Sequence, residues 1–286
     1  MLWTPSKGAL LYEQTHGSSG TTDPGVQVQT GGTASTKGAV VELIASTAFD
    51  AYLMQVIVTG YGISAGTSRL CVDILTGAAT EEVLIADLLC GFVGSFVNVD
   101  PGPVQYMIPI YVPAGTRLSA RAAGDRINTV CRVSIQLYGG AGYPPFPVGQ
   151  RVVTYGITTV PNGTNVTPGA SGAEGAWTQI TASTTEDAMC VIPGAQPPTG
   201  DTTLTTALFR GDVGVGAATE EIIAGGGREQ SFLWRLNSNE FAHGVVNPIP
   251  LFADIPSGSR LTTRLSRTSA ADTVAAWNMA LYCVSA

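Results

Sequence analysis

The sequence GAATEE at residues 77–82 occurs a second time at residues 216–221. The two copies are 216 − 77 = 139 residues apart. Further along, PAGTRL at residues 113–118 is matched by PSGSRL at residues 256–261, an offset of 256 − 113 = 143. A slowly rising offset is expected when two copies of one domain differ by a few inserted loop residues. A period of this length is a whole domain, so the sequence predicts a tandem duplication rather than a solenoid.

Short apolar runs bounded by turn residues fill both copies, and no segment has a sustained helical period. Short apolar runs separated by turn residues are typical of antiparallel β-sandwiches. We therefore expect an all-β protein with two tandem, jelly-roll-like antiparallel β-sandwiches and an extended N-terminal arm. The candidate strands lie at residues 40–44, 52–58, 70–75, 82–85, 106–111, 117–121 and 130–138, and in the second copy at residues 177–180, 203–209, 231–236, 260–264 and 275–283.

The composition of the segments suggests four parts. These are an arm at residues 1–35, a sandwich at 36–140, a linker rich in Gly and Pro at 141–172, and a second sandwich at 173–286. Part of the linker resembles the arm, with Pro24 matched by Pro161 at an offset of 137, so the repeat unit includes an arm as well as a sandwich. A segment rich in Gly and Thr has little apolar surface to offset the entropy lost on ordering. We therefore expect the arm to contact another subunit.

The charge balance favours a surface that is matched to protein partners. Only 12% of residues are charged, against roughly 25% in typical domains. The chain has twelve arginines and two lysines, and lysine is the residue most depleted at interfaces, although codon bias in a GC-rich host remains an alternative. The net charge of −7 argues against nucleic-acid binding. No apolar run approaches the ~18 residues needed for membrane insertion.

Residues that could carry chemistry are few. The five cysteines lack CxxC spacing, which favours buried reduced thiols over disulfides or zinc, and the N-terminal residues do not support a secretory signal. The Glu81-Glu82 and Glu220-Glu221 pairs could serve acid–base catalysis or calcium, but neighbouring strand residues face opposite ways. A structural turn or an inter-subunit salt bridge is the favoured interpretation. We predict no catalytic, metal or cofactor residue, and we take the tryptophans as core. The candidate interface residues are Glu81, Glu82, Arg117, Glu220, Glu221 and Arg260.

Several segments resemble a repeated module of tailed-bacteriophage structural proteins. They are STKGAVVELIASTAFDAY at residues 35–52, VDI at 72–74 with GAATEE after it, and PIYVPAGTRL at 109–118. The resemblance covers residues 30–140 and 170–286 and carries no functional residue over. It departs in the second copy, where Glu186 replaces Phe49 and the loop before Pro256 is longer.

The resemblance implies a virion component of jelly-roll type. We expect a non-enzymatic capsid decoration, cement or head-spike protein that contacts the major capsid protein or other virion proteins and is assembled in the host cytoplasm. Local threefold placement of such modules implies a homotrimer. The alternative is a tail-fibre or receptor-binding module for a host surface glycan, and a weaker one is a glycoside hydrolase.

Overall fold

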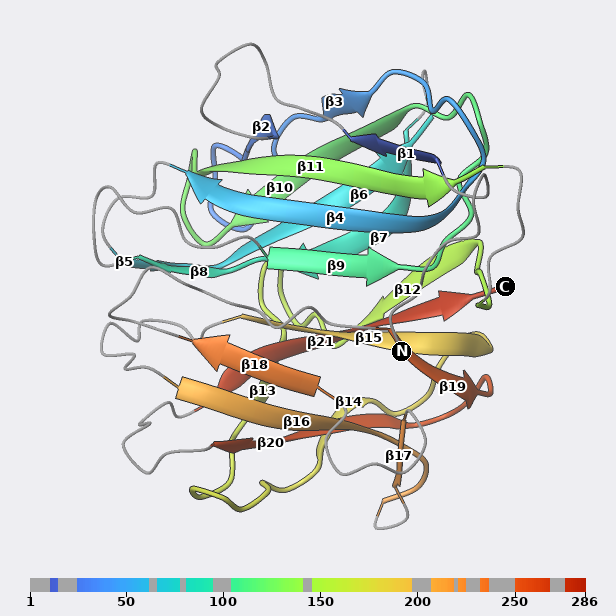
Figure 1. Cartoon of the computed structure of the whole chain (residues 1–286). Coiled ribbons are helices and arrows are strands. Elements are labelled where there is room, and N and C mark those ends of the chain that lie inside the picture. The colour runs from blue at the N-terminus through green and yellow to red at the C-terminus, as the bar shows by residue number, and fades with distance from the viewer. Residues whose placement is uncertain are drawn as a thin grey trace.

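The computed structural model shows an all-β chain with no helix among the residues it describes (Figure 1). The strands form four main antiparallel sheets and a two-stranded ribbon of β5 (Gly66–Ser68) and β8 (Phe92–Gly94). This confirms the fold class expected from the sequence. No helix long and apolar enough to cross a membrane occurs in this part of the chain. The structure describes residues 11–14, 25–61, 66–77, 81–94, 104–140, 146–196, 207–218, 221–224, 232–236, 250–267 and 276–286.

The first sandwich pairs two sheets. Sheet 1 has the order β1-β11-β4-β9, with β2 also paired to β11, and sheet 2 has the order β3-β10-β6-β7. The strands of sheet 1 are β1 (Leu11–Gln14), β2 (Val26–Gln29), β4 (Ala51–Tyr61), β9 (Val104–Ile108) and β11 (Val130–Gly139). Those of sheet 2 are β3 (Val41–Ile44), β6 (Leu70–Thr76), β7 (Glu82–Leu89) and β10 (Leu118–Gly124).

The second sandwich repeats this order, with one additional strand, β18, in its second sheet. Sheet 3 has the order β12-β21-β15-β19, with β13 also paired to β21, and sheet 4 has the order β14-β20-β16-β17, with β18 also paired to β16. The strands of sheet 3 are β12 (Arg151–Tyr155), β13 (Thr164–Val166), β15 (Ala188–Gln196), β19 (Leu251–Ile255) and β21 (Trp277–Ser285). Those of sheet 4 are β14 (Thr178–Thr181), β16 (Ala207–Val215), β17 (Ile222–Ile223), β18 (Phe232–Leu236) and β20 (Leu261–Arg267).

The duplication is also visible in individual side-chain contacts. The Thr47 hydroxyl donates a hydrogen bond of 2.7 Å to the Pro113 carbonyl, and the Thr184 hydroxyl donates one of 2.9 Å to the Pro256 carbonyl. The partners lie at offsets of 184 − 47 = 137 and 256 − 113 = 143, the values read from the sequence. The two sandwiches therefore share both topology and local bonding.

The arm and the linker both contribute strands to the sheets. Within the expected arm, β1 and β2 pair with β11 of their own sandwich, and the rest of residues 1–24 lies outside the described residues. Within the segment expected to be a linker, β12 and β13 pair with β21. The structure differs here from a simple tether, because short extended segments complete the hydrogen bonding of a neighbouring strand. The equivalent roles agree with a repeat unit that includes an arm.

Sheet 3 is covered on both faces and lies at the centre of the molecule (Figure 1). On β21, Leu281 and Cys283 face a core shared with sheet 4, whereas Ala280, Tyr282 and Val284 belong to the core of the first sandwich. Every residue of β21 is buried. A strand that is buried on both faces reads as an almost continuous apolar run, and ALYCV at residues 280–284 has that character.

The two halves meet where edge strands β7 and β9 of the first sandwich reach sheet 3. We call the side formed by these two strands the open edge. The Tyr282 hydroxyl donates to the Asp87 carbonyl (3.0 Å) and accepts from the Leu89 amide (2.7 Å), and the Tyr106 hydroxyl donates to the Leu89 carbonyl (2.5 Å). The Tyr106 and Tyr282 rings pack edge to face at 5.4 Å. One sandwich thus closes its core on the sheet of the other.

Candidate functional site

The repeated GAATEE segment forms the turn of a β-hairpin in both copies. The first hairpin joins β6 to β7 and the second joins β16 to β17. Both turns begin at a glycine with positive φ, 95° at Gly77 and 126° at Gly216, a conformation that residues with a Cβ adopt at a cost. This backbone geometry explains the glycine that opens each copy of the hexapeptide.

The two turns differ in length by one residue. Strand pairing joins Thr76 to Glu82 in the first hairpin and Val215 to Ile222 in the second. The paired residues are therefore separated by residues 77–81 in one copy and by residues 216–221 in the other, which makes Glu221 the structural equivalent of Glu81. Matching the two hexapeptides letter by letter pairs Glu81 with Glu220, and the structure moves this match by one position because the second connection is one residue longer. Glu220 itself lies outside the described residues.

An arginine clamps each turn to its sandwich. Arg117 Nη1 donates to Glu81 Oε1 (2.9 Å) and to the Gly77 carbonyl (2.9 Å). Arg260 Nη1 donates in the same way to Glu221 Oε1 (2.8 Å) and to the Gly216 carbonyl (3.4 Å). Four of the six predicted interface residues thus come together as two pairs, one within each sandwich. Their contact with another subunit stays a prediction.

The Nε atom of each arginine reaches a third strand. Arg117 Nε donates to Glu42 Oε2 of β3 (2.9 Å), and Arg260 Nε donates to Gln179 Oε1 of β14 (3.1 Å). Hydrogen bonds to Glu42 and then to Glu81 raise the pKa of Arg117 above its ordinary value. The acid partners differ in exposure, with side chains 27% exposed at Glu81 and 4% at Glu221. The second clamp therefore depends more strongly on its arginine.

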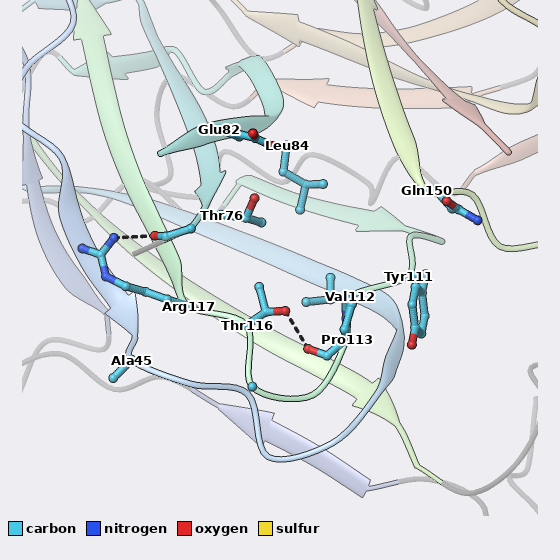
Figure 2. Close-up of a pocket in the computed structure, with 12 residues that line it drawn as sticks. Ala45, Thr76, Glu82, Leu84, Tyr111, Val112, Pro113, Thr116, Arg117 and Gln150 are labelled. Carbon is cyan, nitrogen blue, oxygen red and sulfur yellow. Dashed lines mark hydrogen bonds between the residues drawn. The ribbon is translucent and has the colours of Figure 1, made fainter. Parts of the chain in front are cut away.

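A pocket of about 660 Å³ opens beside the first clamp (Figure 2). Polar side chains on its wall come from Thr76, Thr116 and Arg117 of the first sandwich and from Gln150 of the second half. Leu84 and Glu82 close it from β7 (Figure 2). Because Glu81 turns to Arg117 while Glu82 lines the pocket, the adjacent acids do not act on one site.

Tyr111 gives this pocket an aromatic wall. Its ring stacks on Tyr52 with centroids 5.7 Å apart and planes inclined at 28°. Partial burial and the nearby Asp50 carboxylate raise the pKa of Tyr111, so its hydroxyl stays protonated and able to donate. In the second copy the equivalent positions are Asp254 for Tyr111 and Ile222 for Glu82, the latter 74% exposed. The pocket chemistry belongs to the first copy.

Sequence reasoning missed a second charged cluster on the outer face of sheet 2. Lys37 Nζ contacts Asp73 Oδ1 (2.6 Å) and Asp87 Oδ1 (2.5 Å), and Arg121 Nε contacts Asp73 Oδ2 (2.8 Å). Burial lowers the pKa of Lys37, but Cys71 and the two aspartates outweigh burial and raise it above the ordinary value. The available signal was an aspartate inside an apolar strand, at Asp73 and again at Asp212.

The cysteines are the buried thiols that the sequence indicated. Burial raises the pKa of Cys131, Cys190 and Cys283 to about 12, and also raises that of Cys71 and Cys90. No cluster of three His, Cys, Asp or Glu residues suited to a metal occurs in the described part of the chain. Trp277 is core, 1% exposed, whereas Trp177 lies over Arg264 at 4.4 Å and is only half-buried, which corrects its assignment to the core.

No protein-family model and no curated protein sequence matches this chain. Among solved structures it is similar to PNGF-II, with 10% identity and a TM-score of 0.38, covering 96% of this chain and 66% of that one. It is also similar to the CBM22-1-CBM22-2 tandem domain of Paenibacillus barcinonensis Xyn10C, with 9% identity and a TM-score of 0.28, covering 98% and 92% of the two chains. At this level of similarity neither structure bears on function.

Proposed function

We propose that the protein is a non-enzymatic structural component of a tailed-phage virion, a capsid decoration or head-spike protein that acts through subunit contacts. The observation that carries the proposal is the docking of the open edge of one sandwich on sheet 3 of the other. This module already packs against a copy of itself through edge strands and an apolar face. Such a contact suits a protein whose work is assembly, because it needs no ligand and no moving part.

Composition and local bonding support the same proposal. The arginine clamps hold the turns within each sandwich and leave a surface poor in lysine, the residue least favoured at interfaces. The resemblance of both copies to phage structural modules points in the same direction. The proposed partners are the major capsid protein or other virion proteins, with three copies of this chain around a local threefold axis.

The test is to locate the protein on particles. A tag fused after the exposed residue Ala286 leaves β21 intact, and purified virions that carry the tagged chain can then be imaged. We expect regular density at symmetry-related positions on the head. Purified particles that lack the chain, but are infectious and stable, would refute a structural role in the virion.

A second candidate function rests on the Tyr111 pocket. An aromatic wall beside hydroxyl, amide and carboxylate groups is the kind of surface on which a sugar ring can pack, which favours a receptor-binding module for a host surface glycan. Binding of cell-surface glycans should then be lost in Tyr111→Ala. The matched control is Asp254→Ala, at the equivalent position of the second copy. Glycan binding that survives Tyr111→Ala would exclude this pocket.

A further inference from the structure

The outer face of sheet 4 holds a small polar pocket that differs from its counterpart in the first copy. It has a volume of about 350 Å³. Its charged residues are Glu174, Arg210, Asp212 and Arg264, and Ser266 also lines it. The equivalent positions in the first copy are Lys37, Cys71, Asp73, Arg121 and Ala123, because Arg210 pairs across the strands with Ser266 as Cys71 does with Ala123. The duplication thus provides an internal comparison of the two sites.

In the first copy the charges of this site satisfy one another. Lys37 contacts two carboxylates, those of Asp73 and Asp87, and Arg121 contacts Asp73 again. The Asp73 side chain is 2% exposed, so both cations are needed to compensate its burial. Cys71 fills the remaining space as a neutral group within 3.4 Å of the Lys37 ammonium. This arrangement leaves no cation over.

In the second copy the pairing is uneven. Arg264 Nε contacts Asp212 Oδ2 (2.9 Å), its Nη1 forms an ion pair with Glu174, and Trp177 covers its guanidinium at 4.4 Å. One arginine therefore takes both acids of the site. Glu174 occupies the position that Lys37 has in the first copy. The second copy therefore gains an acid beside Arg264, whereas a lysine there would have placed a second cation beside Asp212.

Among the residues that the structure describes at this site, Arg210 is the cation left over. It is exposed, and no carboxylate pairs with it among the described residues. It lies on β16 two residues before Asp212, on the face of sheet 4 away from the core, because Phe209 and Val213 face inward. Its guanidinium stands at the wall of a pocket whose other arginine is already fixed in place. A guanidinium presents parallel N–H donors that fit the two oxygens of a carboxylate.

We propose that the Arg210 pocket binds a carboxylate, supplied by an acidic side chain of a partner protein in the assembly. The carboxylate chemistry follows from a guanidinium that has no carboxylate partner in the described part of the chain, whereas the protein nature of the partner rests on the proposed virion function. Glu174 and Asp212 do not block the site, because Arg264 holds both.

The first experiment uses the full chain and sodium acetate as the probe, titrated at pH 7 against sodium chloride at constant ionic strength. The signal is the chemical shift of the arginine Nε–Hε resonances. We expect a saturable shift of the Arg210 resonance with a dissociation constant on the order of millimolar, the range of a single charge-assisted contact. A linear shift with no saturation would overturn the site.

Three variants test how acetate binding depends on the charges of the site. With the Nε–Hε resonance of Arg264 in the same pocket as the signal, Arg210→Gln should weaken acetate binding about tenfold or more, and Glu174→Gln should strengthen it by removing a like charge. Arg151→Gln is the matched control, because Arg151 is an arginine 67% exposed that lies on sheet 3. Equal affinity in Arg210→Gln and the wild-type protein, or an equal loss in Arg151→Gln, would refute the assignment. All three positions are at the surface, and thermal unfolding verifies that each variant is folded.

A second probe separates the sources of the carboxylate. Glucuronate carries the same group on a sugar ring, and affinity equal to that of acetate supports an acidic side chain of a protein. A much tighter fit for glucuronate would overturn the protein partner and assign the pocket to an acidic glycan. Acetate binding is independent of where the chain sits on a particle, so failure here and failure of the virion proposal are distinguishable.

Discussion

At the scale of single residues, the duplication turns each side chain into a comparison with its counterpart. The clamps at Arg117 and Arg260 are alike in geometry and differ in the burial of their acids. Lys37 and Glu174 also occupy equivalent positions, and they carry opposite charges. Side chains at equivalent backbone positions therefore differ in charge or in burial between the two copies.

The Arg260→Ala variant should destabilise the protein more than Arg117→Ala. Removing Arg260 strips the main charged partner from the Glu221 carboxylate, whose side chain is 4% exposed, and we expect a loss of about 2 kcal/mol. Arg117→Ala leaves behind Glu42 and Glu81, whose side chains are 50% and 27% exposed to water, so its effect should be smaller. Urea unfolding of both variants measures the difference. Equal losses would contradict the role given to burial.

Stability should fall steeply in alkali because the thiols are buried. The pKa of Cys131, Cys190 and Cys283 is raised from 9.0 in the unfolded chain to about 12 in the folded one. A raised folded pKa adds stability that is complete below pH 9 and is lost as pH rises from 9 toward 12, because only the unfolded chain ionises there. Each such thiol costs about 1.4 kcal/mol per pH unit in this window. Urea midpoints at pH 8 and pH 10 test this, with Cys131→Ala expected to flatten the change.

At the scale of elements, the turn that leads into β3 and its counterpart before β14 have different residues at one left-handed position. Ser35 has φ of 64° where the equivalent Gly172 has 76°, and each donates its amide to a strand carbonyl, that of Gly124 or of Arg267. A serine in this left-handed region is strained, whereas a glycine is not. The same turn thus contains a strained residue in the first copy and an unstrained one in the second.

Exchanging these two residues should move stability in opposite directions. Ser35→Gly is expected to stabilise by about 0.5 kcal/mol, since relief of strain exceeds the added entropy of the unfolded glycine. Gly172→Ser is expected to destabilise by about the same amount, and nothing lies within 4 Å of the Cβ it would add. Thermal unfolding of the two single variants is the measurement, and shifts of the same sign would count against strain.

The elements also show what the sequence could and could not predict. Repetition and short apolar runs predicted the sandwiches, because β-pairing needs only local alternation and turns. The β12 strand was missed inside a Gly/Pro-rich stretch, since five residues carry too little pattern to identify a strand. The clamp of Glu81 by Arg117 joins residues 36 positions apart and depends on strand register, which a single sequence does not state. The extra turn residue before Glu221 was hidden because the hexapeptide itself is unchanged.

At the scale of the whole molecule, the shared sheet makes two repeats into one body. Residues of β21 belong to both cores, and the Tyr282 hydroxyl bonds to the first sandwich. An apolar run such as residues 280–284 predicts burial on both faces but does not say what covers each face. For that reason the close association of the two repeats could not be predicted from the sequence.

The two sandwiches should therefore unfold in a single transition. Val133→Ala in the first core and Val213→Ala in the second remove equal groups from sites that are both 0% exposed. Each is expected to lower the one midpoint, by about 2 kcal/mol in free energy. Circular dichroism and tryptophan fluorescence should report the same curve. Two transitions, each moved by only one of the variants, would show that the halves are independent.

The central position of β21 has a consequence for biosynthesis. Strand β11 ends at residue 139 and β21 begins at residue 277, so the ribosome makes 277 − 139 = 138 further residues before it starts the strand that completes sheet 3, the cover of the open edge. At roughly 5 to 20 residues per second this takes roughly 7 to 28 s. During that interval the nascent first sandwich exposes an apolar edge that can be bound by chaperones or pair wrongly with a neighbouring nascent chain. The last strand of the second repeat is thus the step that completes the folding of the first.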